Sequence, residues 1–234
     1  MSARTPSPLL LPLDDYSESP DDKARVELEL SLGMVPVGDP VLTQVARTVS
    51  HNDISSPRVQ RVIARLFAAA TGQRAARKLD GKRRMLVGLA APQIGEDLQI
   101  VVFDTKIGTD RKKPGKLECF INPEIIWRSR ETEEGREGCF SAGSVWGLVR
   151  RPVAVKIKAF ITEGTRATRI FEGFQARIAQ HEIDHLNGIR FPDRIKSDKK
   201  RHWVHAEKLS NYPIYISQWP RHCSYEQWLR LKLG

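Results

Sequence analysis

Residues 180–188 read Gln-His-Glu-Ile-Asp-His-Leu-Asn-Gly and contain the pattern His181-Glu182-x-x-His185. Side chains four positions apart lie on one face of a helix, so the two imidazoles can bind a single metal ion. Glu182 lies about 100° around the helix from His181, where it can reach a water on that ion without being a ligand. The pattern therefore predicts metal-assisted hydrolysis, in which the metal acidifies a water and the carboxylate takes up and returns its proton.

The residues around this pattern favour a buried helix over a chance match on a charged surface helix. Ile178, Ile183 and Leu186 supply an apolar face, and Gly188 can end the helix. We expect this helix to run from about residue 173 to residue 187.

The rest of the chain predicts a domain of the α+β class. Apolar residues at helical spacing predict a helix over residues 57–78, and another helix is expected over 225–233. Runs of apolar and β-branched residues predict strands at 99–103, 119–121, 125–127 and 153–161, with a turn at Asn122-Pro123. One early helix, several strands and a late helix are typical of the α+β class.

The composition limits the class of protein. The chain has 234 residues, 40% of them hydrophobic, which suits one medium-sized domain with extensions. No apolar run approaches the roughly 18 residues of a membrane span, and three scattered cysteines are too few for a disulfide framework. We therefore expect a reducing compartment, the cytoplasm, with an organelle such as the mitochondrion as the alternative.

The net charge of +10 is unevenly placed. Residues 1–30 carry −4, which leaves +14 for the remainder. A basic body attracts polyanions such as RNA or the ribosome, although ordinary solubility explains the charge equally well. Residues 1–32 are rich in Ser, Pro and Asp, and we expect them to form a flexible N-terminal extension.

Two histidines do not complete a catalytic metal site, because a third protein ligand is expected. The downstream candidates have no recognisable spacing; they are Asp193, His202, His205 and Glu207. Upstream, Cys139 lies in the segment Glu-Gly-Cys-Phe-Ser (137–141), and a cysteine thiolate is a good ligand for zinc or ferrous iron. The alternative for Cys139 is a small buried apolar residue, the usual state of a free cysteine.

A third segment, Gly-Leu-Ala-Ala-Pro-Gln-Ile-Gly (88–95), surrounds one amide side chain with small residues. Glycine and alanine let the backbone lie close to a ligand, and Gln93 could donate a hydrogen bond to a developing oxyanion. Taken alone, the segment would more often be a tight turn. Together and in this order, the segments 88–95, 137–141 and 180–185 resemble the motifs of peptide deformylases.

The resemblance covers about residues 33–196 and implies the deformylase fold, in which antiparallel or mixed strands wrap around a central helix that carries the HExxH motif. Residues 197–234 would then form a basic C-terminal extension. The implied reaction is hydrolysis of the N-formyl group of N-formyl-methionyl nascent polypeptides, with release of formate. One divalent metal ion is implied, usually Fe²⁺, although Zn²⁺, Ni²⁺ or Co²⁺ would also fit.

The resemblance also implies roles for individual residues. The metal ligands would be Cys139, His181 and His185. Glu182 would be the general acid and base, while Gln93 and the backbone N–H of Phe140 would polarise the formyl oxygen. Gly88 and its neighbours would pair with the substrate backbone. The methionine pocket would be lined partly by Val87, Phe174 and Ile178.

Three positions depart from the family pattern: Leu86 replaces a glycine, Phe140 replaces a leucine, and Trp146 lies in a run that differs from the usual one. These bulky residues are expected to border the substrate and to alter its preference without changing the reaction. Arg151 matches a family arginine and is expected to pair with Glu137 or Asp184. Two other functions remain open, a metallopeptidase that cleaves internal peptide bonds and a catalytically weakened deformylase-like binding protein.

Overall fold

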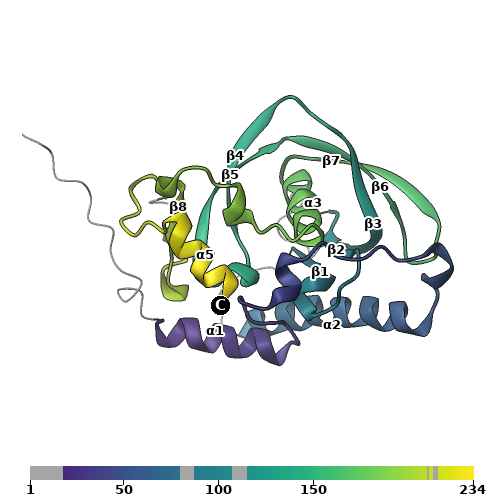
Figure 1. Ribbon diagram of the computed structural model, residues 1–234, viewed down its shortest axis with the longest axis horizontal. Helices are drawn as coiled ribbons and strands as arrows, with labels where there is room; N and C mark the ends of the chain where they lie inside the picture. The colour runs from purple at the N-terminus through teal and green to yellow at the C-terminus, as the bar shows by residue number, and fades with distance from the viewer. Residues whose placement is uncertain (1–17, 80–86, 107–114, 210, 213–215) are drawn as a thin grey trace, which may run out of the picture.

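The helix that carries the two histidines is the centre of the fold. In the computed structural model, which describes residues 18–79, 87–106, 115–209, 211–212 and 216–234, helix α3 spans Gly173–Leu186. It begins at Gly173, where φ is +54°, and Gly188, where φ is +66°, follows its end. Residues other than glycine rarely adopt such a positive φ. Strands arch over α3 (Figure 1), and the predicted helix is confirmed to within one residue.

A five-stranded antiparallel sheet, in the order β1-β2-β3-β6-β7, lies against α3. Its strands are β1 (Gly88–Ala90), β2 (Ile100–Asp104), β3 (Leu117–Arg128), β6 (Ala154–Phe160) and β7 (Arg166–Glu172). Residues of β2 alternate between two cores: Ile100 and Val102 pack with helix α2 (Pro57–Leu79), whereas Val101 and Phe103 pack with α3. The sheet is therefore covered on both faces at β2, which explains why this strand is buried along its whole length.

A second sheet, in the order β4-β5-β8, closes the other side of α3. It consists of β4 (Thr132–Gly138), β5 (Val145–Pro152) and β8 (Arg201–Trp203). Strands β3, β4, β5 and β6 follow one another in the chain and carry it over α3 from one sheet to the other (Figure 1). The α+β class with strands around a central helix is confirmed.

The predicted turn at Asn122-Pro123 is wrong, because β3 is one continuous strand with shifts of register at this point. Asn122 has φ of +49°, and its side chain accepts a hydrogen bond from the Val49 N–H and donates one to the Val49 carbonyl. The residue therefore produces an irregularity within the strand and attaches it to the preceding loop.

Part of the segment expected to be a flexible N-terminal extension is helical. Residues Pro20–Ser31 form helix α1, which begins with a capping box between Ser19 and Asp22 and has Pro20 in its first turn. Ser19, Pro20 and Asp22 are thus the start signal of a helix. At the other end, helix α5 spans Tyr225–Leu233, as predicted, and Ser224 caps it.

Among the described residues, no helix is long and apolar enough to cross a membrane. Residues 1–17 and Leu86, about which the sequence made predictions, lie outside the described residues.

Candidate active site

Three potential metal ligands meet at the face of α3 that points toward β4. Cys139 directly follows β4, and His181 and His185 lie one turn apart on α3. One ligand atom from each of the three residues lies within 4.8 Å of the other two. The Cys139 Sγ and His185 Nε2 atoms are 3.3 Å apart, and the two imidazole centroids are separated by 5.1 Å.

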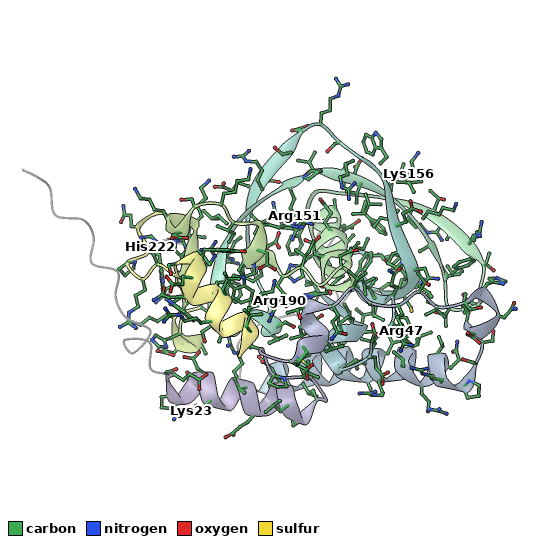
Figure 2. The ribbon with its side chains drawn as sticks, in the orientation of Figure 1. Lys23, Arg47, Arg151, Lys156, Arg190 and His222 are labelled. Carbon is green, nitrogen blue, oxygen red and sulfur yellow. The ribbon has the colours of Figure 1, made fainter. Side chains whose placement is uncertain are left out.

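A buried ion-pair network orients His181. The Nδ1 atom of His181 lies 2.9 Å from Glu137 Oε2, so its Nε2 atom is the one left for Cys139 and a metal. Arg151, labelled in Figure 2, donates to both Glu137 oxygens at 2.6 and 2.8 Å and to Asp184 at 2.8 Å. The predicted pairing of Arg151 is therefore confirmed with both partners. Burial opposes the charge of Glu137, but the hydrogen bonds from Arg151 and His181 outweigh it and hold the pKa of Glu137 well below its ordinary value.

Arg177 is a further member of this network, and the sequence motifs do not predict it. Glu137 contacts His181 and Arg177 in addition to its predicted partner Arg151. Arg177 donates to Glu137 at 2.8 Å and to the Val149 carbonyl at 2.9 Å. Arg177 lies four residues before His181, on the same face of α3, and this spacing is the sequence feature that indicates a role near the histidines.

The two histidines are in different electrostatic environments. Burial lowers the pKa of His185 well below its usual value, which keeps the ring in the neutral form that binds metals. Burial opposes a charge on His181 too, but its hydrogen bonds to Cys139 and Glu137 prevail and raise its pKa well above the usual value. The surroundings of His181 thus favour a positive charge, which a divalent cation can supply in place of the proton.

Glu182 points from α3 toward the edge strand β1. Its side chain is buried, and its Oε2 atom has no hydrogen-bond partner among the described residues. Burial raises the pKa of Glu182 to about 7. Gly88 of β1 lies directly against it, since a Cβ atom at Gly88 would overlap the Glu182 carboxylate. A carboxyl with a pKa near neutrality is suited to accept and return a proton.

Gln93 connects the glycine-rich segment to the cysteine segment. Its Oε1 atom accepts a hydrogen bond from the Ala90 N–H at 2.8 Å, which fixes the orientation of the amide. Its Nε2 atom donates to Cys139 Sγ at 3.3 Å and to Ser141 Oγ at 3.1 Å. The donor end of the amide therefore lies in the cluster of potential ligands, beside Phe140.

The residues expected to form a methionine pocket lie near one another but differ in exposure. Ile178 is buried in the core under α3, and Val87 packs against the same core. Phe174, one turn before Ile178, is 50% exposed. A half-exposed phenylalanine next to buried aliphatic residues offers an apolar surface to a ligand, whereas Ile178 also serves as core.

The indole of Trp146 lies against Gly138, the residue before Cys139, on the face of β5 opposite to that of Arg151. The indole also packs against a cluster formed by the C-terminal segment, with Tyr212 at a centroid distance of 6.0 Å. Trp146 alternates along β5 with Val145, which is buried in the core beneath α5. Because successive side chains of a strand point to opposite faces, Trp146 attaches the C-terminal segment to β5.

Comparison with known proteins identifies the family of this chain. The sequence model of the polypeptide deformylase family matches residues 32–201, which is more than two thirds of the chain. The chain belongs to the polypeptide deformylase family. The resemblance noted from the three segments is thereby confirmed.

Individual deformylases agree with this assignment. The peptide deformylase of Desulforudis audaxviator (strain MP104C) is 37% identical over 169 residues, covering 72% of this chain and 96% of that protein. The Met-Ala-Ser-bound crystal structure of the class I type b enzyme from Acinetobacter baumannii is 32% identical, with a TM-score of 0.56, and covers 69% of this chain and 96% of that one. The Thermotoga maritima enzyme is also 32% identical, with a TM-score of 0.55, covering 70% and 97%.

The deformylase is therefore a metal-dependent hydrolase that removes the N-formyl group from N-formyl-methionyl nascent polypeptides and releases formate. These relatives do not favour a metallopeptidase or a catalytically weakened deformylase-like binding protein. The α1 and α5 helices lie outside the part of the chain that the family model matches.

Proposed function

We propose that Cys139, His181 and His185 bind the catalytic metal of this deformylase. The observation that supports the proposal is the convergence of one thiol and two imidazoles within 4.8 Å, with His181 oriented by Glu137. This donor set suits a divalent metal of the late first row, and we propose Fe²⁺, with Zn²⁺, Ni²⁺ or Co²⁺ able to replace it. When bound, the metal would acidify a water and polarise the formyl carbonyl.

We assign the proton transfer to Glu182. The carboxylate takes the proton of the attacking water as the water oxygen bonds to the formyl carbon. It returns that proton to the amine nitrogen as the C–N bond breaks, so that formate and a free N-terminus leave. The pKa of about 7, raised by burial, makes both halves of this transfer accessible near neutral pH. The free Oε2 atom is the position from which the proton would move.

We assign stabilisation of the developing negative charge to Gln93 and to the backbone N–H of Phe140. The Gln93 amide is held by the Ala90 N–H, so its donor end already points toward Cys139 before the reaction. Phe140 follows Cys139 directly and opens the short 3-10 turn Phe140–Ala142. Both donors therefore lie beside the proposed metal ligands.

The substrate backbone is proposed to pair with β1. This three-residue strand is an edge of the five-stranded sheet, since only β2 pairs with it among the described strands. An extended peptide can add to such an edge through main-chain hydrogen bonds. Gly88 would then face the formyl end, and Val87, Phe174 and Ile178 would contact the methionine side chain.

Formate release from formyl-Met-Ala-Ser by the full-length protein, purified without oxygen, tests this proposal. We expect turnover that a chelator abolishes and Fe²⁺ restores, with about one metal per chain. If Fe²⁺ is the native metal, air should inactivate the enzyme, whereas the Zn²⁺ or Ni²⁺ form should resist. Activity that survives complete metal removal would contradict the metal site.

We also propose that the deformylase acts in the cytoplasm and contacts the ribosome through its basic surface. The charge of +10 supports an attraction to ribosomal RNA, and exposed basic residues are present in the C-terminal segment, including Lys196, Lys199 and Lys208. Co-sedimentation with ribosomes at increasing salt is the test. Binding that does not weaken with salt would contradict an electrostatic contact.

A further inference from the structure

Arg190 joins the cysteine segment to the loop at Val37 and to the C-terminal helix α5. Its side chain is completely buried, just after the end of α3. The guanidinium donates to three carbonyl oxygens: Val37 at 2.6 Å, Ser141 at 2.8 Å and Lys232 at 3.0 Å. Figure 2 labels Arg190 near α5, on the connection that follows α3.

Each of these carbonyls belongs to a different part of the fold. Ser141 is two residues after the proposed metal ligand Cys139, and Val37 precedes the first 3-10 turn of the domain. Lys232 is in the last turn of α5, where helix carbonyls lack partners within the helix and carry a partial negative charge. The planar guanidinium of an arginine has several donors in fixed directions and can bind all three carbonyl oxygens at once. The ammonium group of a lysine lacks this fixed geometry.

The C-terminal helix in turn holds the guanidinium. The Trp228 ring lies over Arg190 with a distance of 4.9 Å from the guanidinium carbon to the ring centroid. Trp228 is itself fully buried and donates from its indole N–H to Asp193 at 2.7 Å. Packing of α5 completes this arrangement, since Trp228 shares a core with Ala142 and Val145, and Cys139 packs against that core.

We infer that Arg190 is a positioning residue for the metal centre, through which docking of the C-terminal helix α5 orients the Cys139–Phe140–Ser141 segment. The inference rests on the proposed assignment of Cys139 as a metal ligand. Removal of the guanidinium would free the Ser141 carbonyl and loosen the segment that presents the thiolate. Metal affinity would then fall although no ligand had changed, as expected for a residue that supports ligands from behind.

The chain offers a matched control in Arg201. This arginine is also completely buried and donates to three carbonyls, of Ile195, Cys223 and Pro192, at 2.6, 3.1 and 3.4 Å. It lies 5.3 Å from the centroid of the Tyr225 ring of α5. None of its contacts among the described residues is with the segment 139–141, so Arg201 stabilises the C-terminal segment without reaching the metal ligands.

The test compares full-length Arg190→Met, Arg190→Lys and Arg201→Met with the unsubstituted protein, all loaded with Co²⁺. The dissociation constant is measured by competition with a chelator, the thiolate-to-cobalt absorption is recorded, and thermal unfolding is followed on the metal-free proteins. For Arg190→Met we expect about 10–100-fold weaker binding of Co²⁺ and an altered absorption band. Arg190→Lys should lie between this variant and the unsubstituted protein.

Arg201→Met should lower the unfolding temperature by a similar amount and leave the Co²⁺ dissociation constant unchanged. Equal losses of Co²⁺ affinity in Arg190→Met and Arg201→Met would overturn the inference, as would unchanged affinity in Arg190→Met. If Arg190→Met does not fold, Arg190→Lys decides, and Co²⁺ affinity equal to that of the unsubstituted protein rejects the inference.

A Cys139→Ala variant distinguishes failure of the proposed metal site from failure of the positioning role of Arg190. If Cys139→Ala retains Co²⁺ with full affinity, the proposed metal site itself is wrong. If Cys139→Ala loses Co²⁺ and Arg190→Met does not, the metal site stands and only the positioning role of Arg190 fails.

Discussion

At the scale of single residues, the role proposed for Glu182 can be separated from metal binding. Glu182→Gln keeps the size of the side chain and removes its ability to carry a proton. We expect the metal content to stay near that of the unsubstituted enzyme and kcat to fall by about 100- to 10,000-fold. Metal analysis and formate release are measured on the same sample. Loss of metal from this variant would show that Glu182 is a ligand.

Gly88 is a second residue whose substitution tests the geometry. A Cβ atom at this position would overlap the carboxylate of Glu182, which is the movable end of a flexible side chain. Gly88→Ala should therefore displace the carboxylate and leave the protein folded. A misplacement of about 1 Å can cost roughly 100-fold in rate, so we expect kcat to fall by that order with metal content unchanged. Wild-type kcat in Gly88→Ala would mean that the Glu182 carboxylate works equally well from another position.

At the scale of elements, strand β5 serves two purposes. The inward face of β5 contributes Val145 and Val149 to the core beneath α5 and Arg151 to the ion pairs behind the histidines. Its other face carries Trp146 to the C-terminal segment. Period-two alternation therefore separates support of the active site from attachment of the extension.

Trp146→Arg should consequently affect stability and not substrate choice. The substitution removes ring packing against Tyr212 and brings a second cation beside Arg136, whose guanidinium lies 5.8 Å from the Trp146 centroid. We expect unfolding to become easier by about 1–3 kcal/mol. Urea unfolding measures this loss, and kcat/KM across formyl-Met-Xaa peptides should keep the same profile. A changed profile would place Trp146 at the substrate after all.

At the scale of the whole molecule, the two ends of the chain are joined through Asp22. This fully buried carboxylate at the start of α1 accepts hydrogen bonds from the Ala206 N–H at 2.9 Å and from Ser144 at 3.1 Å, and it pairs with His205 at 2.8 Å. Burial opposes its charge, but the hydrogen bonds from His205, Ser19 and Ala206 lower its pKa from 3.8 to about 2. The Asp22 carboxylate of α1 therefore binds both Ser144, just before β5, and residues 205–206 of the C-terminal part of the chain.

The lowered pKa predicts acid sensitivity of this junction. Because the folded-state pKa of Asp22 is below its unfolded value, the ionised carboxylate stabilises the fold above about pH 4, and this contribution is lost as the pH falls toward 2. The difference in free energy of unfolding between the unsubstituted protein and Asp22→Asn should thus be largest near neutral pH and shrink on acidification. Urea titrations at pH 6, 4 and 3 measure it. A difference that is independent of pH would show that the charge of Asp22 does not matter.

The sequence alone determined the chemistry of this protein to a large extent. The spacing of His181 and His185 is a property of a single helix, and the segments around Gln93 and Cys139 consist of residue types with few other uses in that combination. Helices α2, α3 and α5 were predictable for the same reason, since apolar periodicity, caps and glycine stops are read within a few neighbouring residues.

Only the tertiary structure decided how this chemistry is supported. The contact of Gly88 with Glu182, the donation of Arg190 to three carbonyls, the position of Trp146 and the ordering of α1 on Asp22 all join residues far apart in the chain. Local spacing carries no information about such contacts, because their free energy arises from burial and hydrogen bonding after the segments have come together. The candidate residues of the reaction could therefore be named from the sequence and its resemblance to a known family, whereas the residues that hold them in place became visible only in the folded chain.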